Sequence, residues 1–140
     1  NVVIGIQSKH GNLLRNFCES KSNFIIHENL PNLASLFAYS DLFIGAGGAT
    51  TWERACLGLP ALIVPVAQNQ IFANEQLAMY LDSKYLLINK YKISDELEVK
   101  IDYLIHNKKL LPTLSRKLFS LVDGMGINRI VSLMQHISCQ

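Results

Sequence analysis

Residues 45–58 read GAGGATTWERACLG and combine residue types that suit an anionic ligand. The residues that could contribute are Gly45, Gly47, Gly48, Thr50, Thr51 and Glu53. A helix N-terminus has unpaired N–H groups and a partial positive charge, so a helix that starts after a glycine turn attracts phosphate. Glycines let the backbone approach an anion closely and supply turns with positive φ. Because the carboxylate of Glu53 can accept hydrogen bonds from a ribose diol, the stretch predicts a nucleotide site.

The same stretch also has a purely structural interpretation. The glycines would then form a tight turn, Thr50 would cap the following helix, and Glu53 would complete the capping arrangement. GAGG does not fit the pattern GxGxxG, and GxxxxGK[ST] occurs nowhere in the chain. The sequence therefore disfavours a dinucleotide-binding fold and a P-loop.

Short apolar runs alternate with helix-length amphipathic segments along the chain. The predicted strands are Val2–Ile6, Phe24–His27, Asp41–Gly45, Ala61–Pro65 and Tyr85–Ile88. Helices are predicted at Leu13–Ser20, Thr50–Leu57 and Phe72–Leu81, and another helix starts at Pro31 and carries Leu33, Leu36 and Phe37. From Ser94 onward the whole chain has a helical pattern, which includes Leu114–Val122 and Ile127–Ile137. This alternation predicts βαβ units, and therefore an α/β, Rossmann-like three-layer fold with helices on both faces of a parallel sheet.

Ligands of such sheets bind at the carboxyl ends of the strands, where the strand order reverses. The question is therefore which residues follow each predicted strand. These are Gln7, Ser8 and Lys9 after the first strand, Glu28 and Asn29 after the second, GAGGATT after the third, and Ala67–Gln70 after the fourth.

Length and composition narrow the function classes. The chain has 140 residues, which is enough for one domain with a sizeable core, and its net charge of +2 does not predict nucleic-acid binding. The apolar runs DLFIGA and ALIVPVA are too short to span a bilayer, and no signal peptide is visible, so a cytoplasmic protein is expected. Three widely spaced cysteines and four scattered histidines predict free thiols and no metal site.

The stretch SDLFIGAGGATTWERACLGLPALIVPVAQNQ resembles the C-terminal lobe of GT-B enzymes. Within this group, the chain more closely resembles the UDP-sugar hydrolases of pseudaminic acid biosynthesis and their spore-coat polysaccharide relatives. Its resemblance to the N-acetylglucosaminyltransferase that makes lipid II is more remote. It runs from about Val2 to the tail LVDGMGINRIV, where Asp123, Gly124, Gly126 and Arg129 fit the closer family. The pattern GGxTTWERxxLGLP is specific enough to favour a nucleotide site over the structural interpretation.

This resemblance implies that UDP or a UDP-sugar binds to the lobe. The residues that would hold the diphosphate are Gly47, Gly48, Thr50 and Thr51. Glu53 would accept from the ribose, and the backbone near Asn29 and Leu30 would read the uracil. Asn69 and Gln70 match the family's NQ and would face the phosphate or the sugar. Two positions depart from the family's pattern: Ala49 stands where Ser is usual, and Gln68 stands where an acid is common.

A two-lobe parent enzyme is also implied. The family's catalytic histidine lies in a GxGHxxR-like motif of an N-terminal lobe, and this chain contains no such motif, so we assign no catalytic residue. The first strand and Gly-rich loop of the C-terminal lobe, normally upstream of VVIGI, are absent too. We therefore expect residues 1–140 to be one nucleotide-binding lobe, a fragment of a longer enzyme that is inactive in isolation. No metal and no cofactor are implied.

Three functions stay open at this stage. The complete protein would hydrolyse a UDP-linked diacetamido trideoxy sugar and release UDP, with water attacking the anomeric carbon or the linked phosphorus. One alternative is a UDP-sugar-dependent glycosyltransferase of the same fold. The other is a nucleotide-binding module without chemistry of its own.

The absent first strand would lie between the counterparts of Val2–Ile6 and Asp41–Gly45. Unpaired strand edges seek partners, so either these two strands pair, giving the order 2-1-3-4-5, or a second copy of the chain fills the gap in a homodimer. Pairing needs no partner and is compatible with right-handed crossovers, so we expect the closed order.

Three further residues near the predicted site carry expectations. Trp52 is expected to pack in the core or between domains, because a helical aromatic usually packs. Arg54 is expected to be exposed and paired with a neighbouring acid. His27 is expected to be a structural histidine with a satisfied hydrogen bond.

Overall fold

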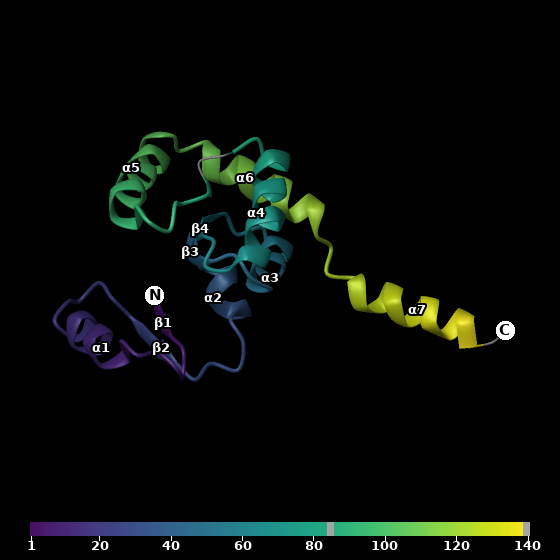
Figure 1. Cartoon of the computed structure of the whole chain (residues 1–140), viewed down its shortest axis with the longest axis horizontal. Coiled ribbons are helices and arrows are strands. Elements are labelled where there is room, and N and C mark those ends of the chain that lie inside the picture. Colours follow the sequence, from purple (N-terminus) through teal and green to yellow (C-terminus); the bar gives the residue numbers. More distant parts are fainter. Residues whose placement is uncertain (84–85, 139–140) are drawn as a thin grey trace. The chain divides into compact units, whose positions relative to one another are not determined.

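A computed structural model describes residues 1–83 and 86–138 of the chain. It divides the chain into two compact units, Asn1–Leu36 and Phe37–Gln140, and Figure 1 labels the elements of both. The short helix α2 (Ala34–Ala38) crosses the boundary between them.

The first unit consists of a parallel strand pair and one helix. Strand β1 (Val2–Ile4) pairs with β2 (Ile26–Glu28), so that Val2 lies opposite Ile26. Helix α1 (Gly11–Glu19) connects the two strands. Ile4 and Cys18 are buried in this unit, and a Cβ on Gly11 would stand 3.5 Å from the Ile4 side chain. The unit is therefore a single βαβ motif.

The second unit repeats the βαβ pattern and adds helices. Its remaining elements are β3 (Phe43–Ala46), α3 (Thr50–Cys56), β4 (Ala61–Val64), α4 (Gln68–Tyr80), α5 (Ile93–His106), α6 (Leu110–Leu121) and α7 (Gly126–Ser138). β3 and β4 are parallel, with Phe43 opposite Ala61. β4 is a continuous apolar run, as is typical of a strand covered on both faces.

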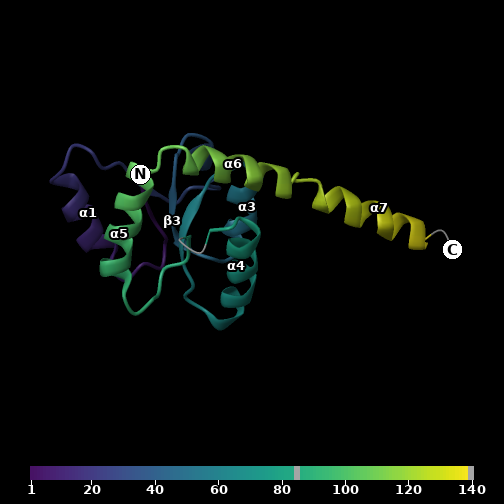
Figure 2. The ribbon, with the colours of Figure 1, turned by 90° about the horizontal axis from the view of Figure 1, so that it is seen from above.

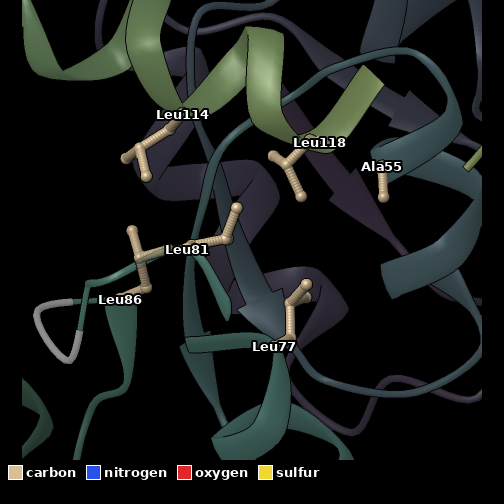
Figure 3. Close-up of a cluster of buried hydrophobic side chains, with 6 residues drawn as sticks. All are labelled: Ala55, Leu77, Leu81, Leu86, Leu114 and Leu118. Atoms are coloured by element: carbon tan, nitrogen blue, oxygen red, sulfur yellow. The ribbon is translucent and has the colours of Figure 1, made fainter. Parts of the chain in front are cut away.

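Helices cover both faces of the β3–β4 pair. Figure 2 shows α5 on one side of β3, with α3 and α4 on the other. On the α5 side, Leu62 packs with Leu104 and Ile88. On the opposite side, buried residues from α3, α4, α6 and the segment that follows α4 converge on one cluster, drawn in Figure 3: Ala55, Leu77, Leu81, Leu86, Leu114 and Leu118. The predicted α/β architecture with helices on both faces of parallel strands is confirmed.

A glycine ends α3 and returns the chain to the sheet. Gly58 has φ +68°, its N–H donates to Ala55, and the N–H of Leu59 donates to Arg54. This pattern is a Schellman motif, which requires the left-handed conformation that glycine adopts most readily. It brings Leu59 and Pro60 directly to the start of β4.

The described residues form two two-stranded sheets, β1–β2 in the first unit and β3–β4 in the second. The expected pairing of β1 with β3 would join the two units and stays a prediction.

The predicted fifth strand is reduced to one parallel bridge between Ile63 and Leu87. The N–H of Ile88 donates to Ile63 at 2.8 Å, so this part of the chain still lies beside β4. Tyr85, where the predicted strand begins, lies outside the described residues.

Several helix starts differ from the prediction. α4 and α6 each begin four residues earlier than expected, at Gln68 and Leu110. The helix expected to start at Pro31 begins only at Ala34, whose N–H donates to the Asn32 side chain. The earlier start of α4 matters for function, because it places Asn69 and Gln70 in the first turn of a helix.

Candidate functional site

The glycine turn joins the carboxyl end of β3 to the N-terminus of α3. Ala49 occupies the N-cap position and offers no side-chain cap, and the N–H groups of Thr51 and Trp52 donate to Gly48 and Ala49. The purely structural interpretation, in which Thr50 caps the helix, is therefore wrong on this point. Within residues 1–83 and 86–138, the N–H groups of Gly48, Ala49 and Thr50 have no hydrogen-bond partner. These three donors are what an anion at this position would need.

The glycines of the turn are required by close packing and not by positive φ. Among the described glycines only Gly58 and Gly124 have positive φ, so that part of the expectation is wrong for Gly47 and Gly48. Gly47 is buried, and a Cβ added to it would stand 2.2 Å from Nδ2 of Asn74. A Cβ on Gly48 would have its nearest neighbour at 3.5 Å. Gly47 is thus pressed against α4, whereas the backbone at Gly48 is open.

The two threonines of the turn have different surroundings. Thr50 is half-buried at the first position of α3. Thr51 is 4% exposed, and its hydroxyl donates to Oδ1 of Asn74 at 3.5 Å. Asn74 has no motif around it in the sequence, and sequence reasoning did not find it. The hydroxyl of Thr51 is therefore engaged inside the protein.

Gln70 lies beside the turn. Its Oε1 accepts from the N–H of Val66 at 3.1 Å, which holds the amide across the start of α4. Its Nε2 is the atom that lies 3.5 Å from the Cβ position of Gly48. Asn69, one residue earlier, is exposed. The structure thus brings the predicted Gln70 to the predicted glycine turn, with its Nε2 beside Gly48.

Glu53, Trp52 and Arg54 follow on α3. Glu53 is exposed in the first turn of the helix. The Trp52 side chain is 47% exposed, so it is not a core residue of this unit. Arg54 is 2% exposed, in contrast to the expected surface ion pair.

Arg54 is held as a buried cation. Its Nη1 donates to the carbonyl of Leu59 at 2.9 Å, and its Nε has no partner in the described part of the chain. Burial lowers the pKa of this guanidinium to about 10. Its visible role is therefore to hold the turn that ends α3.

The predicted uracil-reading residues belong to the first unit. Asn29 follows β2 with φ +54°, a left-handed conformation that asparagine tolerates better than most residues. It lines a cavity of about 220 Å³ at the carboxyl ends of β1 and β2. Arg15 and Glu28, paired at 3.0 Å, line the same cavity, and Leu30 is exposed beside Asn29.

His27 lies in β2. Its Nε2 is hydrogen-bonded to the Asn1 side chain at 2.8 Å. This confirms the expected structural histidine.

The other expectations concern metal, thiols and membrane. No group of three metal-ligating side chains occurs in the described part of the chain. Cys18 and Cys56 are free thiols, and Cys139 lies outside the described residues. None of the helices described here is long and apolar enough to cross a membrane.

The fold and the turn define an α/β lobe whose parallel strands end at an open, glycine-lined backbone. Residues 1–126 match the glycosyltransferase family 28 C-terminal domain, and the chain belongs to this family. This domain is the C-terminal lobe of the GT-B fold. Membership of this family confirms the expected fold, the C-terminal lobe of a GT-B protein.

The chain spans less than half the length of the curated relatives that it matches. It is 25% identical over 135 residues to the spore coat polysaccharide biosynthesis protein SpsG of Bacillus subtilis, covering 96% of this chain and 40% of that protein. It is 34% identical over 94 residues to the UDP-N-acetylglucosamine–N-acetylmuramyl-(pentapeptide) pyrophosphoryl-undecaprenol N-acetylglucosamine transferase of Mannheimia succiniciproducens, covering 66% of this chain and 24% of that protein. The Rickettsia felis transferase of the same name is 32% identical over 100 residues, 69% of this chain and 28% of that protein. No solved structure matches the chain.

Proposed function

We propose that this chain is the UDP-sugar-binding lobe of a nucleotide-sugar enzyme. The observation that carries the proposal is the turn between β3 and α3, where the N–H groups of three residues in a row have no partner among the described residues and the Gln70 amide lies beside the first of them, Gly48. Such an array suits a diphosphate, which accepts hydrogen bonds from backbone donors at a helix start. Membership of a glycosyltransferase family supports the same ligand class.

Each residue has a role in this proposal. Gly47 and Gly48 bring the backbone to the diphosphate, and Thr50 adds a hydroxyl. Thr51 supports the turn from inside, since its hydroxyl is engaged with Asn74. Glu53, exposed on α3, accepts from the ribose diol, and Asn69 and Gln70 face the phosphate or the sugar. Asn29 and Leu30 read the uracil through their backbone.

For the complete protein, we propose hydrolysis of a UDP-linked diacetamido trideoxy sugar with release of UDP. Water would attack the anomeric carbon or the linked phosphorus, activated by a base on another lobe. The similarity over 96% of this chain to a spore coat polysaccharide biosynthesis protein supports a role in surface glycan or nonulosonic acid biosynthesis.

A glycosyltransferase is the second candidate. It is favoured by the two N-acetylglucosamine transferases, which are 34% and 32% identical to this chain. The two candidates differ only in the acceptor, water or a sugar. Product analysis of the full-length protein with a UDP-sugar distinguishes them: free sugar supports the hydrolase, and a new glycoside supports the transferase.

Calorimetry with UDP, ADP and GDP tests the binding proposal. UDP should bind most tightly, because the backbone at Asn29 and Leu30 is proposed to read the base through an edge too narrow for a purine, as the resemblance to UDP-sugar enzymes implies. Equal or tighter binding of ADP would contradict the assignment of the nucleotide.

A further inference from the structure

Asn74 is buried at the centre of the site, although no sequence motif marks it. It lies in the second turn of α4, it is 2% exposed, and all of its polar atoms are engaged. Nδ2 donates to the carbonyl of Gly47 at 2.8 Å and to the carbonyl of Gln70 at 2.6 Å. Oδ1 accepts from the hydroxyl of Thr51.

These partners determine which way the amide faces. The two carbonyl oxygens can only accept, so the nitrogen must face Gly47 and Gln70. The oxygen then faces Thr51, whose hydroxyl can donate. One side chain thereby connects the glycine turn, the first turn of α3 and the first turn of α4.

The fit between Asn74 and Gly47 is close. A Cβ on Gly47 would stand 2.2 Å from Nδ2 of Asn74 and 2.7 Å from the Ile63 side chain. The carbonyl of Gly47 lies at a buried residue, so without Asn74 it would lose its partner away from water. A carbonyl in that position does not stay in place without a replacement donor.

We propose that Asn74 is the positioning residue of the nucleotide site. It does not touch the ligand; it fixes the backbone of residues 47–51 and the Gln70 turn in the geometry that receives the diphosphate. This inference rests on the proposed function for its ligand, and on the hydrogen bonds of Asn74 for its mechanism. Thr51 accordingly acts on the ligand only through Asn74.

The first test compares Asn74→Ala with a matched variant of the same helix. Asn74→Ala should weaken UDP binding by about tenfold or more, because the turn loses its donor. Ala78 is also buried on α4, but its carbonyl accepts from Ser83 and not from the turn, so Ala78→Gly should lower the stability by a similar amount and leave the UDP affinity within about twofold. Parallel losses of affinity in the two variants would overturn the proposal.

A double-mutant cycle tests whether Thr51 influences ligand binding through Asn74. Thr51→Val removes only the hydroxyl and keeps the shape of the side chain. It should weaken UDP binding in the wild-type background and have no further effect in the Asn74→Ala background, because the two residues act as one unit. An equal loss of affinity in both backgrounds would mean that Thr51 contacts the ligand directly, and would overturn the proposal that it acts through Asn74.

Amide hydrogen exchange without ligand separates this inference from the proposed function. The amides of Gly48, Ala49 and Thr50 should exchange faster in Asn74→Ala and in Thr51→Val than in the wild type or Ala78→Gly. If the wild-type chain binds no UDP, the proposed function fails while the exchange rates still decide the role of Asn74. If Asn74→Ala does not fold, Thr51→Val decides it, and unchanged exchange in that variant overturns the proposal.

Discussion

Thr51 and Glu53 lie two residues apart on α3, and their side chains have opposite environments. Thr51 is 4% exposed and bonded inward, whereas Glu53 is exposed. Glu53→Ala should therefore weaken binding of UDP more than binding of pyrophosphate, because the carboxylate is proposed to hold the ribose. A hydrogen bond to a charged group contributes about 1.5–3 kcal/mol, which calorimetry resolves.

The control for this measurement is Glu98→Ala, which removes an exposed acid from α5 and should change neither affinity. If Glu53→Ala lowers the affinity for UDP and for pyrophosphate equally, the residue acts on the start of the helix and not on the ribose.

At the residue scale, the sequence could predict that a glycine turn follows the third strand and precedes a helix, because residue type and spacing carry that information. It could not predict that Thr51 faces the interior, since that depends on α4 packing against α3. Asn74 was missed for a similar reason: it lies 27 residues from Gly47, and a single asparagine in a helical segment carries no local signal. The burial of Arg54 could not be predicted either, because a charged side chain is usually exposed.

At the element scale, the start of α7 is held by a local charge pair. Asp123 accepts from the N–H of Met125 at 3.0 Å and from Nη1 of Arg129 at 3.0 Å. The hydrogen bond from Arg129 is the main cause that lowers the pKa of Asp123 to about 2. Gly124 adopts φ +73° between them. The DGMGINR segment is thus a self-contained helix start.

The pH dependence of α7 follows from this pair. Because the folded pKa of Asp123 is below its unfolded value of 3.8, its contribution is fully present above pH 3.8 and is lost as the pH falls through about 2. Backbone Cα chemical shifts of residues 126–132 should therefore lose helical character between these values. Asp123→Asn should remove that transition and reduce helicity at pH 5, whereas Asp95→Asn on α5 should leave it in place. A wild-type profile that is flat down to pH 2 would contradict this account.

The elements themselves were predictable to different degrees. β4 was recognisable because a continuous apolar run bounded by Pro60 and Pro65 has few other interpretations. The start of α4 was not, since Gln68 and Asn69 are polar and hydrophobic periodicity begins only later. Pairing between β1 and β3 was the weakest expectation, because no turn or register signal joins strands so far apart in sequence.

At the scale of the whole molecule, the chain covers 40% of the SpsG sequence, and we assign no catalytic residue within it. The 140-residue chain should therefore show no turnover of UDP-sugars, even at high protein concentration, because a base and the exclusion of water are both needed. A coupled assay for released UDP measures this. UDP release that co-purifies with the chain and disappears in Glu53→Ala would place the active site within it.

The contrast between Gly47 and Gly48 predicts which of the two glycines would be retained in evolution if the ligand were lost. Gly47 is held by its neighbours on α4, so selection for folding alone would retain it after the ligand was lost. Gly48 has room for a Cβ, so folding does not require glycine there, whereas the proposed approach of a diphosphate does. Under the proposed function, a descendant that keeps the first glycine and carries a bulky residue at the second would be a lobe that still folds and no longer binds the nucleotide.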